Sequence, residues 1–321
     1  MDSVEHARIT VVIDNHVDML LPDREDVKRF GMLQHMIPPN GVPIHSENGI
    51  SYWIELQGNG SSRHLLFDTG LSGSVLLHNF RALGLSAEQL NHCAISHGHL
   101  DHYGGLFPLL AERERALPVA IHPDAFLPKH AIDDRGEKFF KVNGGLERKR
   151  IERANGIVVE ARDAVELGPG TLATGEIPRD PTPFEPPVPI RPEGPAGVFI
   201  ERDGELIDDD ATIDDQAVVL NVEGKGLVVL TACGHSGMIN TIRHAQKLTG
   251  VDQVHAVIGG FHTGFPGVRA ETADKTIEEL REIGPEIIAP MHCSGIRMIS
   301  LVLEEFPDQF LHNTTGSTLI L

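Results

Sequence analysis

Short apolar runs alternate with helical patterns along the chain, and most of the runs end at polar residues. In the N-terminal third, apolar runs predict strands at 8–14, 52–56, 64–70 and 92–96, and helical spacing with a glycine stop predicts a helix at 74–84. Ser86 and Gln89 have the spacing of a capping box. Beyond this region the pattern is mixed up to about residue 172.

The C-terminal third is more regular. Predicted strands at 226–232, 254–260 and 286–290 alternate with predicted helices at 236–250, 272–285 and 294–307. Before it, residues 177–197 hold eight prolines, which exclude a helix or a central strand. That segment is either a linker between domains or an ordered loop. We expect an ordered loop over a cleft, because candidate ligands lie on both sides of it and must meet.

Polar residues with metal-binding side chains follow five of the predicted strands. They are Asp68, His97, His235, His262 and His292. Ligands of α/β sheets bind outside the carboxyl ends of the strands. One such residue would mean little, but five predict a common site.

The densest cluster is the sequence ISHGHLDH at 95–102. His97, His99 and Asp101 alternate, so in an extended loop they converge from one side, and His102 follows at the start of a helix. Imidazole and carboxylate ligands suit zinc, iron or manganese, and a cation supplies the charge that such crowding needs. The alternative is a solvated histidine-rich loop.

These motifs resemble those of the metallo-β-lactamase superfamily. HGHLDH (97–102) is similar to its HxHxDH motif, and LLFDTG (65–70) is similar to its Asp-Thr-Gly turn. GLVVLTACGHSG (226–237), VIGGFH (257–262) and PMHCSG (290–295) resemble one branch, typified by an archaeal dihydropterin-related phosphate synthase of methanopterin biosynthesis. The resemblance is weakest at 107–170 and in the proline-rich stretch.

The resemblance implies an α/β fold, a four-layer αββα sandwich with a metal cleft at one sheet edge. We expect one domain over 1–321, with an irregular insertion at about 107–215 that covers the cleft. Carried over by motif, His97 and His99 would bind a first metal. Asp101, His102 and His292 would bind a second, and Asp68 would support the site by hydrogen bonding or cap a turn.

Two departures from the family pattern concern His235 and Glu176. An aspartate usually stands where we place His235 and bridges both metals, whereas an imidazole has one lone pair. His235 would therefore bind one metal, or only one site would fill well. The usual third histidine of the first metal is missing before the proline-rich loop, where Glu176 is a candidate, as a ligand or a salt-bridge partner. His235 is the other candidate for that missing third ligand. The thiolates of Cys233 and Cys293 would bind zinc well, but we interpret both as small packing residues.

The remaining candidates are weaker. His262 is a candidate metal ligand, substrate contact or structural residue, and Arg179 is a candidate for holding a substrate anion. Asn15, Asp18 and Glu47 resemble residues that line the cleft in this branch, although loop capping explains them equally.

Composition limits the partners. With 27 Lys+Arg and 46 Asp+Glu the formal net charge is −19, which disfavours long nucleic acid, and no apolar stretch has the length of a membrane span. Three cysteines and no signal-peptide pattern at the first residues lead us to expect a cytoplasmic protein. The partner we expect is a small-molecule substrate, and the oligomeric state stays open.

The function implied is a metal-dependent hydrolase that uses a metal-bound hydroxide on an ester, lactone or phosphoester of a small molecule, with a pterin-like or phosphorylated substrate as one option. Asp101 would be the catalytic residue that orients the hydroxide or accepts its proton. Zinc is the expected cofactor, as one or two ions, with iron or manganese as alternatives. An iron-dependent oxidoreductase and a non-catalytic metal-binding protein are the competing hypotheses.

Overall fold

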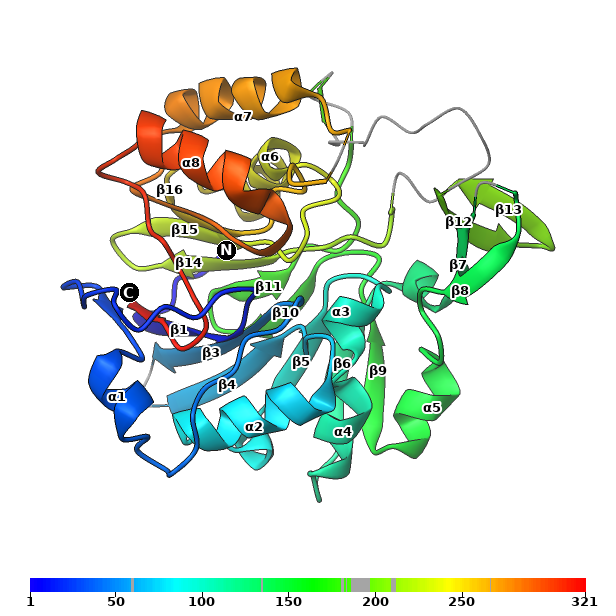
Figure 1. The fold of residues 1–321 in the computed structure, drawn as a ribbon, viewed down its shortest axis with the longest axis horizontal. Helices are drawn as coiled ribbons and strands as arrows, with labels where there is room; N and C mark the ends of the chain where they lie inside the picture. Colours follow the sequence, from blue (N-terminus) through cyan, green and yellow to red (C-terminus); the bar gives the residue numbers. More distant parts are fainter. Residues whose placement is uncertain are drawn as a thin grey trace.

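Two large β-sheets packed face to face make the centre of the molecule, and helices cover the outer face of each (Figure 1). The computed structural model describes residues 1–58, 61–133, 135–179, 182, 184–185, 197–208, 212–265 and 267–321. No helix in these ranges is long and apolar enough to cross a membrane. The expected αββα sandwich is confirmed.

The first sheet has eight strands in the order β2-β18-β1-β3-β4-β5-β6-β9. Their bounds are β1 (His6–Ile13), β2 (Val27–Lys28), β3 (Ser51–Gly58), β4 (Ser61–Phe67), β5 (His92–Ile95), β6 (Leu117–Ile121), β9 (Gly156–Glu160) and β18 (Thr318–Ile320). β4, β5, β6 and β9 are parallel, so β4 and β5 deliver their carboxyl ends to the same edge.

The second sheet has six strands in the order β10-β11-β14-β15-β16-β17. Their bounds are β10 (Val165–Gly168), β11 (Thr171–Ala173), β14 (Val218–Val222), β15 (Gly226–Leu230), β16 (Val254–Gly259) and β17 (Ile287–Pro290). β15, β16 and β17 are parallel, and the three predicted C-terminal strands correspond to them.

Alternating apolar residues explain why both faces of each sheet are buried. Tyr52 and Ile54 of β3 point into the core between the sheets, whereas Trp53 points to the helices on the other face. In β15, Val228 faces the other sheet and Val229 faces helices. This is the period of two expected of strands with two covered faces.

The helices form the two outer layers. α2 (Gly73–Leu83) and α4 (Leu106–Ala111) cover the first sheet, and α6 (Met238–Thr249), α7 (Ala270–Ile283) and α8 (Gly295–Glu305) cover the second (Figure 1). The shorter helices are α1 (Met32–Met36), η1 (Ala87–Gln89), α3 (Leu100–Tyr103), η2 (Pro123–Phe126), α5 (Arg148–Arg153) and η3 (His292–Ser294). The predicted capping box of Ser86 and Gln89 is confirmed at η1.

A third, small sheet stands at one side of the sandwich, in the order β13-β12-β7-β8. It consists of β7 (Lys129–Ile132), β8 (Lys138–Lys141), β12 (Gly197–Arg202) and β13 (Glu205–Asp208). The prediction of an irregular insertion at 107–215 was therefore wrong. Apolar residues such as Val198 and Ile132 give this segment strands of its own, and β6, β9, β10 and β11 also lie within it.

The proline-rich loop lies mostly outside the described residues, so its expected position over the cleft stays a prediction. Where it is described, it contacts the start of α6. Glu185 accepts the backbone N–H groups of Ile239 and Asn240, and Thr182 donates to the Asn240 side chain.

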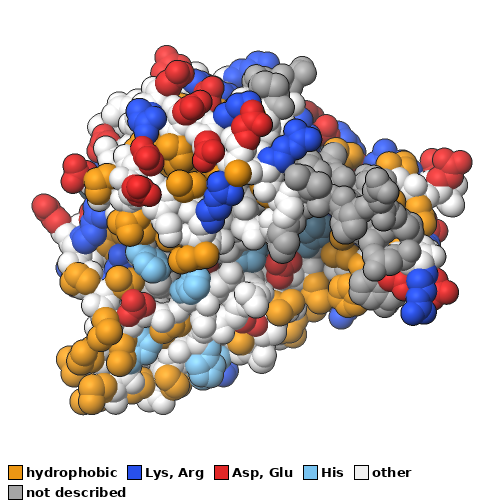
Figure 2. Space-filling model, turned by 45° about the horizontal axis from the view of Figure 1, so that its top comes forward, with side chains coloured by type: hydrophobic (Ala, Val, Ile, Leu, Met, Phe, Trp, Pro, Cys, Tyr) orange, Lys and Arg blue, Asp and Glu red, His pale blue; other side chains and the backbone are white. Residues whose placement is uncertain are grey.

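One surface feature belongs to α1. Met32, Leu33, Met36 and Ile37 are all exposed there, and α1 has no buried residue. Hydrophobic side chains gather at the lower left of Figure 2, the side on which α1 lies in Figure 1.

Candidate functional site

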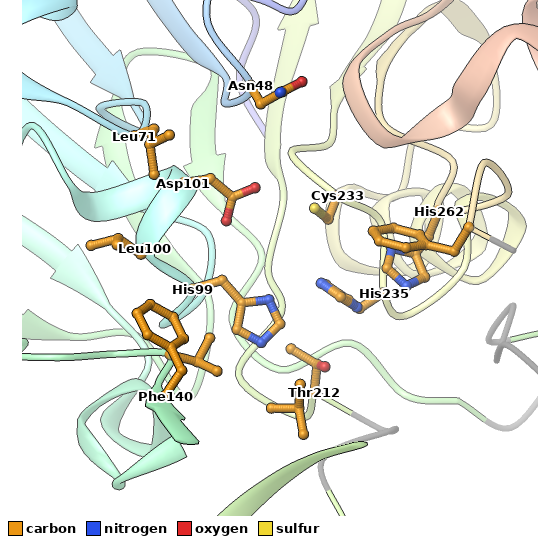
Figure 3. A pocket seen from close by; sticks show the side chains of 13 residues that line it. Asn48, Leu71, His99, Leu100, Asp101, Phe140, Thr212, Cys233, His235 and His262 are labelled. Carbon is orange, nitrogen blue, oxygen red and sulfur yellow. The ribbon is translucent and has the colours of Figure 1, made fainter. Parts of the chain in front are cut away.

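The histidines predicted from the strand ends lie together where the carboxyl ends of both sheets meet. β5 leads into His97–His102, β15 leads into Cys233–His235, and β17 leads directly to His292. Figure 3 shows His99 and Asp101 on one side of a pocket, facing Cys233, His235 and His262 on the other. The site therefore needs both sheets, and neither half of the sequence holds all of it.

Three histidines form the first group of donors. His97 Nε2 lies 3.0 Å from His99 Nδ1 and 3.2 Å from His235 Nε2. Four ligands around zinc, each at about 2.0–2.1 Å, stand about 3.3 Å apart. The spacing of these nitrogens therefore matches a shared cation.

The second group contains two imidazoles, a carboxylate and a thiol: Asp101, His102, Cys233 and His292. Cys233 Sγ lies 3.2 Å from His102 Nε2 and 3.4 Å from His292 Nε2. Asp101 Oδ2 lies 3.5 Å from each of these nitrogens. Four potential ligand atoms, one from each residue, thus converge on one point, as in a tetrahedral metal site.

Electrostatics separate the two groups. Burial and the neighbouring imidazoles hold the pKa values of His97 and His235 well below the usual value, which keeps both rings neutral. Burial also opposes charge on His102, but the carboxylates of Asp101 and Asp68 outweigh it and raise its pKa well above the usual value. Burial raises the pKa of the Cys233 thiol. His97 and His235 of the first group are therefore neutral, whereas His102 and Cys233 of the second group carry protons.

Buried aspartates hold the loops that carry these histidines. Asp68 accepts the Ser96 N–H at 2.7 Å and Asp214 accepts the Gly98 N–H at 2.7 Å. Asp215 accepts the Ser236 N–H at 2.8 Å, and Asp14 accepts the His292 N–H at 3.0 Å. Each of these donors is a histidine of the site or its neighbour in sequence. Burial raises the pKa of Asp14 to about 7 and that of Asp215 to about 6.

Asp68 has the supporting position that the resemblance implied. Its Oδ2 lies 2.6 Å from His102 Nδ1 and accepts the Ser96 hydroxyl at 2.7 Å. The bond to Nδ1 orients the ring so that His102 Nε2 faces Cys233 and Asp101. Carboxylates commonly fix metal-binding histidines in this way. Asp68 has a φ of 59°, and His262 and His292 have values of 54° and 49°. Such backbone strain in non-glycine residues clusters at functional sites.

Asn15 also belongs to the surroundings of the site. Its Nδ2 donates to the His292 carbonyl at 3.1 Å, and its Oδ1 lies 3.3 Å from His292 Nδ1. This bond leaves His292 Nε2 facing the second group. Asn15 thus contacts a histidine of the site, and not the pocket.

Other candidates lie elsewhere. The Glu47 carboxylate accepts from Leu71 N, Ser72 N and Ser72 Oγ, so it caps the loop that leads into α2. Asp18 is an exposed loop cap that accepts the Leu20 N–H.

Glu176 was a candidate for a ligand or a salt-bridge partner, and its carboxylate pairs with Arg162 at 2.9 Å. It belongs to neither donor group, so the salt-bridge alternative holds. Arg179 donates to the Thr212 carbonyl at 2.7 Å and is not among the residues that line the pocket.

His235 takes one of the roles that the sequence left open, whereas Cys233 differs from its prediction. His235 groups with His97 and His99, as the alternative in which it supplies the missing third histidine expects. Cys233, which we interpreted as packing, lies in the second group instead. Gly234, with a φ of 70°, turns the chain between them, so the two side chains reach different groups. The sequence CGH gave no signal that separated these roles.

His262 is placed by its ring contacts. Its ring packs at a tilt against His235, with centroids 4.0 Å apart, and against Phe265, with centroids 4.5 Å apart. It also forms a cluster of potential ligand atoms with Cys233 and Cys293. His262 therefore lies on the pocket wall beside both donor groups.

A pocket of about 510 Å³ opens above the two groups. Its walls are largely apolar, and Phe140, Val142 and Val198 come from the small sheet and the chain that follows β8 (Figure 3). Leu71, Phe140 and Phe265 are exposed although they are large and apolar, which is typical of ligand-binding walls. His99, Asp101, Cys233 and His235 supply its polar floor.

These donor sets fit metal ions. Neutral imidazoles that crowd to 3.0–3.2 Å need a cation or a proton between them, and burial disfavours protonation of His97 and His235. The second group joins a thiol and a carboxylate to two imidazoles, a combination typical of transition-metal sites.

Comparison with known proteins agrees with this geometry. The family model described as the metallo-beta-lactamase superfamily matches residues 47–292. Among curated proteins, the chain is similar to 7,8-dihydropterin-6-methyl-4-(beta-D-ribofuranosyl)-aminobenzene-5'-phosphate synthase of Methanocaldococcus jannaschii. The two are 30% identical over 271 residues, which are 84% of this chain and 88% of the relative.

Solved structures share the fold. Tm1679, a metal-dependent hydrolase of the beta-lactamase superfamily, aligns over 98% of both chains with a TM-score of 0.70 and 24% identity. A diphosphatase from the PhnP family aligns over 99% of this chain and 98% of its own, with a TM-score of 0.50 and 13% identity.

Proposed function

Because the chain belongs to the metallo-β-lactamase superfamily, we propose that it is a metal-dependent hydrolase of a small ester, lactone or phosphoester. The observation that carries this proposal is the pair of adjacent donor groups on the floor of one pocket. His97, His99 and His235 would hold one ion, and Asp101, His102, Cys233 and His292 would hold the other.

Zinc is the metal that we propose for both groups. Three imidazoles suit zinc, and a thiol among the donors of the second group favours zinc further over manganese or magnesium, which prefer oxygen ligands. When bound, such ions polarise a carbonyl or phosphoryl oxygen and lower the pKa of water.

Asp101 is the proposed catalytic residue. Although burial opposes its ionisation, the neighbouring His102 and His292 hold its pKa below the usual value, so it is a carboxylate at neutral pH. It lines the pocket as well as the second group, so it can orient a water molecule and accept its proton there. His262 lies on the opposite wall, where its ring can contact the oxygen of the reacting group.

The substrate that we propose has an apolar body and one reactive ester or phosphoester group. Among the described residues that line the pocket there is no Lys or Arg, so the walls offer apolar contact and the floor offers the polar groups. The synthase that resembles this chain carries a pterin and a phosphate in its name, which supports a ring-containing or phosphorylated compound. We do not expect long nucleic acid or a membrane as partner, and we expect a cytoplasmic location.

The test is elemental analysis of unchelated protein, followed by a screen of esters, lactones and phosphodiesters with the metal found. We expect about two zinc ions per chain and turnover of at least one substrate. Asp101→Asn should lose at least about a hundredfold in rate, because the amide cannot accept a proton. Metal-loaded protein that consumes oxygen and turns over none of these substrates would instead support the iron oxidoreductase.

A further inference from the structure

Three consecutive residues before β14 contact both of the loops that form the first donor group. Asp214 accepts the N–H of Gly98, which lies between His97 and His99, and Asp215 accepts the N–H of Ser236, which follows His235. Gln216 donates its backbone N–H to Ser96 O at 3.0 Å and its side-chain amide to Ile95 O at 2.8 Å. We call Asp214, Asp215 and Gln216 the strap.

The strap is buried, although it lies at the end of an acidic stretch of sequence, residues 201–215. Asp214 is 0% exposed, Asp215 2% and Gln216 1%. Buried carboxylates are costly unless they are paired, and each of these two accepts a hydrogen bond from a backbone N–H group of a loop that carries a histidine. The acidic residues therefore have a specific structural task.

Lys129 joins the strap to the pocket wall. Its Nζ lies 2.7 Å from Asp214 Oδ1, and both side chains are fully buried. Lys129 begins β7, which pairs with β8 and β12, the strands that carry Phe140 and Val198 into the pocket. A buried ion pair adds little net stability compared with an apolar pair of the same shape. Its value here lies in fixing the position of Asp214.

The first donor group depends on such a fixed position. His97 and His99 follow β5 of one sheet, and His235 follows β15 of the other, yet their nitrogens must meet within 3.2 Å. Displacement of either loop by about 1 Å breaks that geometry. The strap contacts both loops at once, so it sets their separation.

We propose that the strap is a positioning segment for the metal held by His97, His99 and His235, and that Lys129 ties this metal to the pocket wall. The proposal rests on the proposed function only for the presence of the metal. The second donor group has its own supports, because Asp14 holds the His292 N–H and Asp68 holds His102. Damage to the strap should therefore weaken the first group selectively.

Cobalt titration of the full chain separates the two groups. The thiolate of Cys233 gives a near-ultraviolet charge-transfer band when the second group fills, whereas visible bands alone report the three histidines. In Asp215→Ala, the Ser236 N–H loses its acceptor, and we expect the cobalt affinity of the first group to fall by about 10- to 100-fold. The charge-transfer band should titrate as in the wild type. Asp215→Asn keeps an acceptor oxygen and should recover most of the affinity.

Two variants serve as controls. Asp14→Ala removes the acceptor of the His292 N–H, so it should weaken the charge-transfer band while leaving the first group unchanged. Asn79→Ala removes buried hydrogen bonds to Val12 O and His45 O, which belong to neither donor group. It should lower thermal stability without changing the cobalt affinity of either group. If Asp215→Ala does not fold, the double variant Lys129→Met/Asp214→Ala tests the other loop of the first group, that of His97 and His99, without an unpaired buried charge.

Folded strap variants that bind both ions with wild-type affinity would overturn the proposal. So would equal weakening of both groups in Asp215→Ala, because a general loss of structure would then explain it. Wild-type protein that binds no metal is a distinct result, and it would contradict the proposed function.

Discussion

Replacing Asp68 with asparagine should weaken metal binding to the second donor group while leaving the first group unchanged. Asp68 Oδ1 accepts the Ser96 N–H at 2.7 Å, and Oδ2 lies 2.6 Å from His102 Nδ1. If the amide oxygen keeps the bond to Ser96, the amide nitrogen faces His102 and presents a donor to a donor. His102 must then move its proton to Nε2, the atom that lies 3.2 Å from Cys233 Sγ. A protonated Nε2 cannot bind a metal.

The magnitude follows from the bond that is lost. A hydrogen bond to a charged partner contributes about 1.5–3 kcal/mol, and each 1.4 kcal/mol is about tenfold in affinity. We therefore expect the second ion to bind about 10- to 100-fold more weakly, the range that is usual for carboxylates behind metal-binding histidines. Competition with a chromogenic chelator measures this affinity, and the cobalt charge-transfer band identifies the group.

Ser96→Ala is the matched control for this prediction. It removes the hydroxyl that contacts Asp68 and His97 Nδ1 but leaves the bond between Asp68 and His102. We expect this variant to bind the second ion as the wild type does. If Asp68→Asn also binds it with unchanged affinity, Asp68 does not set the tautomer of His102, and the reasoning fails.

Three further predictions concern the second group and the pocket. Cys233→Ala should retain one tightly bound zinc per chain instead of two, as measured by elemental analysis, and retention of both would exclude the thiol as a ligand. Metal binding to the second group should release about two protons near neutral pH, one from the Cys233 thiol, whose pKa burial raises, and one from His102, whose pKa the neighbouring carboxylates raise against the effect of burial. The metal affinity of the second group should therefore rise with pH, while that of the first group changes little. Calorimetry in buffers of different ionisation enthalpy measures the number of protons released. Equal proton release at both groups would contradict the assignment. Phe140→Ala and Phe265→Ala should raise KM several-fold for substrates with an aromatic body and change kcat little, and an unchanged KM would place the substrate elsewhere.

The sequence predicted the histidine cluster well because its signal is local. A histidine or aspartate directly after a buried strand must lie at the sheet edge, whichever strands are neighbours. His97, His99 and His102 also stand close in sequence, so their convergence requires only one loop. The expected strands and helices of the C-terminal third were confirmed for the same reason, since each has its own apolar period and stop residue.

Residues whose role depends on distant partners were harder to predict. Cys233 follows a buried strand, where a cysteine usually packs as a small apolar residue. It belongs to the second donor group only because His102 and His292 approach it from other loops. Asp214 and Asp215 belong to an acidic run that is typical of a solvated surface. They are buried because backbone N–H groups of two other loops meet them, which the local pattern does not encode.

The small sheet was missed for a related reason. Its strands are short, and β7 pairs with β12 across a long stretch of intervening sequence, so no local alternation marks the four strands as one sheet. Glu47 and Glu176 were isolated polar candidates whose sequence left a structural alternative open. The structure agrees with that alternative for both, since Glu47 caps the loop before α2 and Glu176 pairs with Arg162.

Anomalous diffraction at the zinc edge, from crystals of unchelated protein, tests the central claim most directly. The account predicts two separate peaks per chain. One should lie about 2.0–2.1 Å from nitrogens of His97, His99 and His235, and the other about 2.3 Å from Cys233 Sγ, beside Asp101, His102 and His292. A single peak shared by all seven residues, or no peak between these side chains, would contradict it.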